Sequence, residues 1–158
     1  MTPLIIAAAQ SISIAGDLAA NIVWHQRFMQ VAAEQGVQLL VFPELSLTGY
    51  ERGLAAELAF APGTGGSTLT IGADTVALAV CADFSHASHA AAAAQQDADL
   101  YAAGVLITEN GYAPDTALLQ GYASAHSMTV LMANHGGATG GWESAGRSAI
   151  WASVGSLV

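Results

Sequence analysis

Two apolar runs, at residues 37–42 and 75–80, each lead into a chemically reactive side chain. Uninterrupted runs of this kind are typical of strands that are covered on both faces. Pro43 cannot donate to a sheet ladder, so Glu44 should lie where the first strand ends. Cys81, the single cysteine of the chain, directly follows the second run. Two strand ends at one edge of a sheet can bring a carboxylate and a thiol together, one as base and the other as nucleophile.

The remaining segments alternate between strand and helix. Residues 17–35 predict a helix that Asp17 caps and Gly36 ends. The stripe expected to face the sheet consists of Leu18, Ile22, Met29 and Ala33. Further strands are expected at 4–9, 68–71, 100–107, 129–133 and around 149–151, and further helices at 86–97 and 115–127. This order predicts an α/β sandwich, and nothing in the sequence divides residues 1–158 into two domains.

Charge and composition exclude several kinds of partner. The chain carries a net charge of −9 with only three cationic side chains, so nucleic acid and anionic membranes are improbable partners. No apolar run approaches the ~20 residues of a membrane-spanning helix, and no basic region precedes the first apolar run as in a signal peptide. We therefore expect a cytoplasmic protein. The 9% charged content and the abundance of small apolar residues favour a homo-oligomer.

Both reactive positions lie in recognisable motifs. Residues 39–50, Leu-Leu-Val-Phe-Pro-Glu-Leu-Ser-Leu-Thr-Gly-Tyr, resemble the glutamate motif of the nitrilase superfamily, the carbon-nitrogen hydrolases. Residues 76–83, Val-Ala-Leu-Ala-Val-Cys-Ala-Asp, resemble its nucleophile motif. Further matches in the family's order are Ala7-Ala8-Ala9-Gln10, Gly16-Asp17, Asn21, Phe60-Ala61-Pro62-Gly63, Ala98-Asp99-Leu100, Ala133-Asn134 and Gly146-Arg147-Ser148. The resemblance implies the family's α-β-β-α sandwich along almost the whole chain.

The resemblance also implies a reaction. The Cys81 thiolate would attack the carbon of a small non-peptide amide, Glu44 would relay a proton to the leaving amine, and water would hydrolyse the thioester. Nitriles and carbamoyl compounds are further possible substrates because they need the same nucleophile and base. The backbone N–H of Ala82 would stabilise the oxyanion, and no cofactor is needed. Candidate pocket residues are Glu109, Tyr50, Asn134 and His135.

The sequence departs from the family pattern in its cations and in its spacing. Family members use a catalytic lysine between the glutamate and the cysteine, whereas this chain has no lysine and its cations are Arg27, Arg52 and Arg147. Only 36 residues separate Glu44 from Cys81. We interpret the chain as lacking an internal segment, which would join in the loop at 61–67, and the family's C-terminus. Loss of one oxyanion donor lowers a rate by roughly 100- to 1000-fold.

Other functions remain open from the residues alone. Without its lysine, the chain could be a non-catalytic remnant that serves as an assembly module. A DJ-1-like or glutaminase-like enzyme would also use a strand-end cysteine, but at a sharp elbow followed directly by a helix, with a histidine nearby. His86 and His89 could share one helix face, yet two histidines without a third ligand make a poor zinc site, so no metal is expected.

Overall fold

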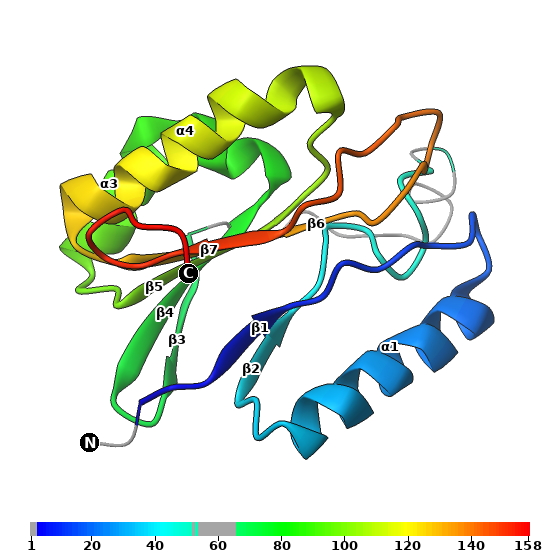
Figure 1. The fold of residues 1–158 in the computed structure, drawn as a ribbon, viewed down its shortest axis with the longest axis horizontal. Coiled ribbons are helices and arrows are strands. Elements are labelled where there is room, and N and C mark those ends of the chain that lie inside the picture. Colours follow the sequence, from blue (N-terminus) through cyan, green and yellow to red (C-terminus); the bar gives the residue numbers. More distant parts are fainter. Residues whose placement is uncertain (1–2, 52, 54–65) are drawn as a thin grey trace.

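The protein has four layers in the order α-β-β-α (Figure 1). The computed structural model describes residues 3–51, 53 and 66–158. In chain order the elements are β1 (Ile6–Ala8), α1 (Leu18–Glu34), β2 (Leu39–Val41), β3 (Thr68–Ile71), β4 (Asp74–Val80), the 3-10 helix η1 (Cys81–Ser85), α3 (Ala87–Gln95), β5 (Leu100–Val105), α4 (Glu109–His126), β6 (Thr129–Asn134) and β7 (Ala149–Trp151). The expected sandwich is confirmed. The loop predicted at 61–67 falls largely outside the described residues.

The two inner layers are sheets of unequal size. β1 and β2 form a parallel pair, whereas the second sheet has the order β3-β4-β5-β6-β7. Its three central strands are parallel, and β3 and β7 pair with them in antiparallel fashion. β1 contacts β6 and β2 contacts β5, so the small sheet lies over the middle of the large one. Helix α1 covers the outer face of the small sheet, and α3 and α4 cover that of the large sheet (Figure 1).

Two apolar clusters hold these layers together. The larger lies between the five-stranded sheet and helices α3 and α4, where small side chains such as Ala90 and Ala93 let α3 approach closely. The smaller lies between the sheets and contains Val76, Leu100, Ala102, Leu131 and Ala133. All six residues of β5 are buried, as expected of a parallel strand covered on both faces. None of the helices in the described part of the chain has the length and apolar character needed to span a membrane.

Helix α1 has the predicted ends but not the predicted buried face. The Asp17 carboxylate accepts a hydrogen bond from the Ala20 N–H at 3.0 Å, and Gly36 follows the helix with φ +71°. The predicted stripe is wrong: its members Leu18, Ile22, Met29 and Ala33 are exposed. The face turned inward instead carries Asn21, His25, Phe28 and Ala32. Hydropathy misses it because two of these side chains are polar and find hydrogen-bond partners inside the protein.

Helix α4 begins at Glu109 rather than at the predicted Asp115, so Pro114 lies inside it. A proline has no N–H and removes one intrahelical hydrogen bond, so the sequence analysis placed the start of the helix after Pro114. Burial of Leu119, Tyr122 and Ala123 against the sheet holds the helix in place. β1, β2 and β5 are shorter than predicted because pairing ends before the apolar run does, whereas the other strands agree with the predicted bounds to within one residue.

Candidate active site

Cys81 lies where β4 turns sharply into η1. Its φ is +42°, a left-handed conformation that is uncommon outside glycine and often marks a functional position. The Asp83 carboxylate supports the turn by accepting a hydrogen bond from the Val80 N–H at 3.0 Å. On the C-terminal side of the turn, the Tyr122 hydroxyl donates a hydrogen bond to the Phe84 carbonyl oxygen at 2.8 Å. The turn is therefore fixed from both ends, and the half-buried thiol stands at the end of the strand.

Glu44 reaches this place from the other sheet, in the turn that follows β2. The turn passes very close to Gly104 of β5: a Cβ atom on Gly104 would lie 2.6 Å from the Phe42 carbonyl oxygen and 3.1 Å from the Glu44 nitrogen. Such distances are shorter than any normal contact of a Cβ atom. Only glycine at this position lets the two sheets approach closely enough for Glu44 to reach Cys81.

Three groups contact the Cys81 thiol. The Glu44 side chain and the backbone of Leu106 lie close enough to shift its pKa, and the Tyr50 hydroxyl lies 3.8 Å from Sγ. Burial raises the pKa of the thiol, and Glu44 raises it further through its hydrogen bond and negative charge. Leu106 and Tyr50 oppose this shift because they favour the thiolate. The resting thiol is thus protonated and has a carboxylate positioned to accept its proton.

His135 supports the Glu44 turn from behind. It is completely buried, and its Nε2 lies 2.7 Å from the Glu44 carbonyl oxygen. Burial lowers the pKa of His135, so the neutral ring with its proton on Nε2 is the form that donates to this carbonyl. In this position the predicted pocket residue His135 holds the backbone of Glu44.

Asn134 has a similar supporting role on the Leu106 side. Its side-chain amide accepts from the Ile107 N–H at 2.8 Å and donates to the Ile107 and Gly146 carbonyls at 3.1 and 2.8 Å. These bonds fix the chain just after β5, where Leu106 contacts the thiol. Asn134 is fully buried and acts on the site through the backbone.

The sequence analysis missed a further layer of support under Glu44. His25 stacks on Phe42 with ring centroids 4.0 Å apart, and its Nε2 lies 2.9 Å from the Ser46 hydroxyl oxygen. Asn21, matched only as a family position, donates to the Ile14 and Leu47 carbonyls at 2.8 and 2.9 Å. The available signal was weak: Asn21 and His25 lie four residues apart and so share one face of the helix.

Of the remaining predicted site residues, Tyr50 lines a cavity, whereas Ala82 and Glu109 are exposed. Tyr50 lines a cavity of about 240 Å³ next to Cys81, together with Leu106, Ile107, Thr108, Asp115 and Trp142. Ala82 is exposed in the first turn of η1, where backbone N–H groups lack intrahelical acceptors. Glu109 is exposed and forms an ion pair with Arg147 at 2.5 Å, and it is not among the residues that line this cavity.

The histidines considered as metal ligands are occupied elsewhere. Nδ1 of His86 lies 3.0 Å from the Ala82 carbonyl oxygen, and Nδ1 of His89 lies 2.8 Å from the Tyr101 hydroxyl. Among the described residues, no three histidine, cysteine, aspartate or glutamate side chains are grouped so that they could hold a metal ion.

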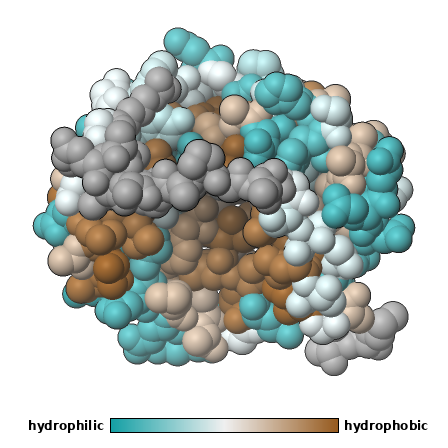
Figure 2. Space-filling model, turned by 180° about the vertical axis from the view of Figure 1, so that it is seen from behind, coloured by the Kyte–Doolittle hydropathy of each residue, from teal (hydrophilic) through white to brown (hydrophobic). Residues whose placement is uncertain are grey.

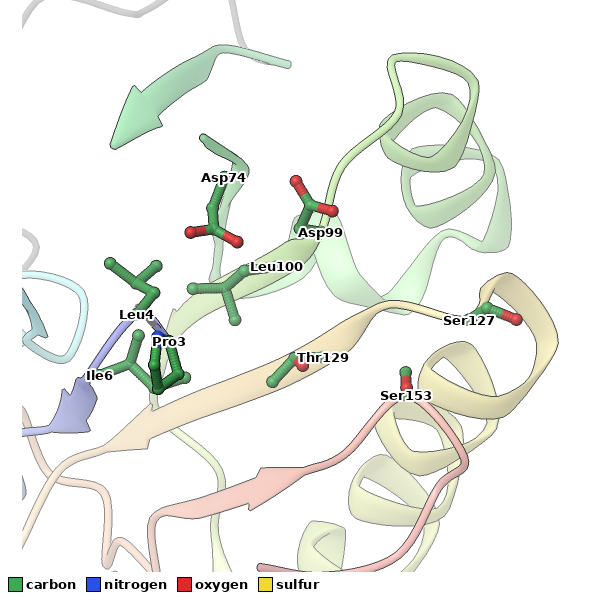
Figure 3. Close-up of a pocket in the computed structure, with 9 residues that line it drawn as sticks. All are labelled: Pro3, Leu4, Ile6, Asp74, Asp99, Leu100, Ser127, Thr129 and Ser153. Atoms are coloured by element: carbon green, nitrogen blue, oxygen red, sulfur yellow. The ribbon is translucent and has the colours of Figure 1, made fainter. Parts of the chain in front are cut away.

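A second cavity, of about 380 Å³, lies at the opposite ends of the strands. Figure 3 shows Asp74 and Asp99 at one side of it and Leu4, Ile6 and Leu100 across its inner wall. The Asp99 carboxylate already accepts a hydrogen bond from the Thr75 N–H at 2.8 Å. β5 begins at Leu100 and Cys81 follows the end of β4, so this cavity is separate from the site that contains the thiol.

Comparison with known proteins supports the resemblance in sequence and in structure. The family model described as carbon-nitrogen hydrolase matches residues 5–69. NitN amidase from Nesterenkonia sp. AN1 superposes with a TM-score of 0.89 at 21% identity, covering 98% of this chain and 87% of that one. A mutant of that amidase with glutamate replaced by glutamine, which shows Michael addition of acrylamide at the active site cysteine, gives 0.89 at 20% identity with the same coverage. Amidase structures from this source are described as belonging to the nitrilase superfamily. This chain has the nitrilase-superfamily fold.

A third structure, a mutant of the same amidase with cysteine replaced by alanine in complex with butyramide, gives a TM-score of 0.86 at 21% identity, with 98% of this chain and 85% of that chain covered. No curated protein sequence matches the chain. The nitrilase fold also bears on the rival expectation. Cys81 does lie at a sharp elbow followed by a short helix, as a DJ-1-like enzyme would require, but the superposition on the amidase structures covers 98% of the chain and favours the nitrilase fold.

Proposed function

We propose that this chain is a carbon-nitrogen hydrolase that cleaves small non-peptide amides through a thioester on Cys81. One observation carries the proposal: Glu44 from one sheet lies close enough to the Cys81 thiol of the other to raise its pKa, with the Tyr50 hydroxyl 3.8 Å from Sγ. The family match over residues 5–69 and the amidase neighbours support the same reaction class.

The geometry suggests a sequence of proton transfers that uses one base twice. Glu44 takes the thiol proton as sulfur attacks the amide carbon, and then gives this proton to the departing amine. Water next attacks the thioester, Glu44 accepts its proton, and the thiol is regenerated as the acid leaves. The N–H of Ala82 would stabilise the oxyanion.

The absence of lysine limits the expected rate. Neither of the two arginines in the described part of the chain replaces it, because Arg27 lies over the Trp24 ring and Arg147 pairs with Glu109. The Tyr50 hydroxyl contacts the thiol in the place where a further donor is needed, and we propose that it supports the oxyanion. A slow enzyme is therefore expected, not an efficient one.

Ammonia release from butyramide tests the proposal directly. Cys81→Ala should abolish it, and Cys81→Ser should nearly do so because a hydroxyl is a much weaker nucleophile under the same base. Glu44→Gln should reduce it by a factor of 100 or more, whereas Glu34→Gln, an exposed carboxylate at the end of α1, should not change it. Mass spectrometry should detect a butyryl group on Cys81.

Two results would oppose the proposal. Undiminished turnover in Cys81→Ala would show that another group does the chemistry. A wild-type protein that neither releases ammonia nor forms the acyl adduct would favour the alternative, a non-catalytic module that keeps the fold without the reaction.

A further inference from the structure

The cavity beside Cys81 extends away from the thiol toward helix α4. Tyr50 and Leu106, which both contact the thiol, line its inner end. The remaining lining residues are Ile107, Thr108, Asp115 and Trp142. At about 240 Å³, it has room for roughly eight atoms of the size of a water molecule. An amide held at Cys81 would therefore place the rest of its chain in this cavity.

Trp142 is held over this cavity by a tight hairpin. Thr139 and Trp142 exchange two backbone hydrogen bonds of 3.0 and 2.9 Å. Gly140 and Gly141 between them have φ of +57° and +78°, as a type I′ turn requires. The Thr139 hydroxyl accepts a hydrogen bond from the Tyr50 N–H at 2.8 Å. One hairpin thus fixes both the tyrosine at the thiol and the indole, which is 48% exposed.

Asp115 supplies a carboxylate to the same cavity. Gly111 precedes it by one helical turn, and a Cβ atom there would lie 3.0 Å from Asp115 Oδ2. The missing side chain leaves space for the carboxylate to fold back toward Ile107 and Thr108. Within the described residues, the Asp115 carboxylate forms no hydrogen bond or ion pair, and partial burial raises its pKa. A carboxylate taken partly out of water without a partner is a ready acceptor for a cation.

We propose that Asp115 and Trp142 make this site selective for amides whose far end carries a protonated amine. A carboxylate can accept hydrogen bonds from an ammonium group while an indole face attracts the same charge. The net charge of −9 attracts cationic substrates in addition. This inference rests on the proposed function, because the amide end is placed at Cys81.

The test compares 4-aminobutyramide with pentanamide. The two amides share the same carbon chain, but the first ends in an ammonium group and the second in a methyl group. The ratio of their kcat/KM values should favour 4-aminobutyramide by about tenfold or more in the wild-type protein. Asp115→Asn should bring this ratio close to one, and Trp142→Leu should lower it in part. Asp97→Asn removes the same charge beside α3, at the opposite ends of the strands, and should retain the wild-type ratio.

Calorimetric binding to the Cys81→Ala protein gives a readout that needs no turnover. There, 4-aminobutyramide should bind more tightly than pentanamide, and the added substitution Asp115→Asn should remove the difference. Equal binding and equal kcat/KM for the two amides would overturn the inference while leaving amide hydrolysis intact. Selective binding without any hydrolysis would support the inference for the cavity and contradict the proposed function instead.

Discussion

At the scale of single residues, Cys81 is under opposing influences. Burial and Glu44 keep the proton on sulfur, whereas Leu106 and Tyr50 favour its loss. Under the proposed function, this balance keeps the thiol unreactive until an amide arrives and the proton moves to Glu44. A permanently ionised thiol would instead be open to alkylation and oxidation.

This balance predicts opposite pKa changes in two variants. Glu44→Gln removes the negative charge that raises the thiol pKa, so the pKa of Cys81 should fall and more thiolate should be present at a given pH. Tyr50→Phe removes a group that favours the thiolate, so the pKa should rise. The pH dependence of iodoacetamide alkylation measures both shifts, and the wild-type midpoint should lie above that of an exposed cysteine in a peptide.

Glu44→Gln should therefore alkylate faster but hydrolyse amides more slowly than the wild-type protein. Both activities falling together would mean that Glu44 only holds the thiol in position.

At the scale of elements, the site depends on the approach of the β2 turn to β5. Gly104 makes this approach possible, while His25 and His135 hold the turn from two other directions. Glu44 therefore belongs to one sheet and Cys81 to the other, and their distance is set by how the sheets pack.

Gly104→Ala should push the Glu44 turn away from β5. The added methyl would lie 2.6 Å from the Phe42 carbonyl, and such overpacking costs about 1–3 kcal/mol in the free energy of unfolding. Amide turnover should fall further than this loss explains, because the folded fraction also has a displaced base.

Gly121→Ala in α4 is the matched control. A Cβ atom there meets nothing within 4 Å, and alanine in a helix should add about 0.5–1 kcal/mol of stability. Urea unfolding and butyramide turnover measure both effects. Normal turnover in Gly104→Ala would show that Glu44 does not need this approach.

At the scale of the whole molecule, the two-stranded sheet covers only part of its five-stranded partner. It lies mainly over β5 and β6 and, of β4, buries Val76 but not the C-terminal half of that face. Leu78 and Val80 of β4 are accordingly 37% and 58% exposed. Figure 2 shows a hollowed apolar region on the side of the molecule opposite β7. Apolar surface of this kind favours association.

We expect the protein to self-associate through this uncovered face of β4. The average mass in light scattering should increase with protein concentration, and also with salt, which screens the repulsion due to the charge of −9. Leu78→Glu should oppose association. Thr70→Glu, on an exposed position of neighbouring β3, adds the same charge and should have little effect. A wild-type protein that is monomeric at every concentration and salt level would contradict this expectation.

The sequence alone determined the kind of fold and pointed to Glu44 and Cys81 as the proposed reactive pair. Apolar runs and helix caps located every described strand and α-helix to within a few residues, apart from the start of α4, but did not predict the 3-10 helix η1. The motifs around Glu44 and Cys81 singled out the two side chains that the structure brings into contact. Apolar runs, helix caps and motifs consist of residues close together in the sequence, so they can be recognised without the tertiary structure.

Tertiary structure decided how the pair is held. Asn134 and His135 were predicted for the pocket but act from behind it, since their partners are backbone groups of segments far away in the sequence. Asp115 and Trp142 were not singled out, because only folding brings α4 and the hairpin to the same cavity. The face of α1 was misjudged for the same reason: burial of a polar side chain depends on partners, and partners come from the packing of distant segments.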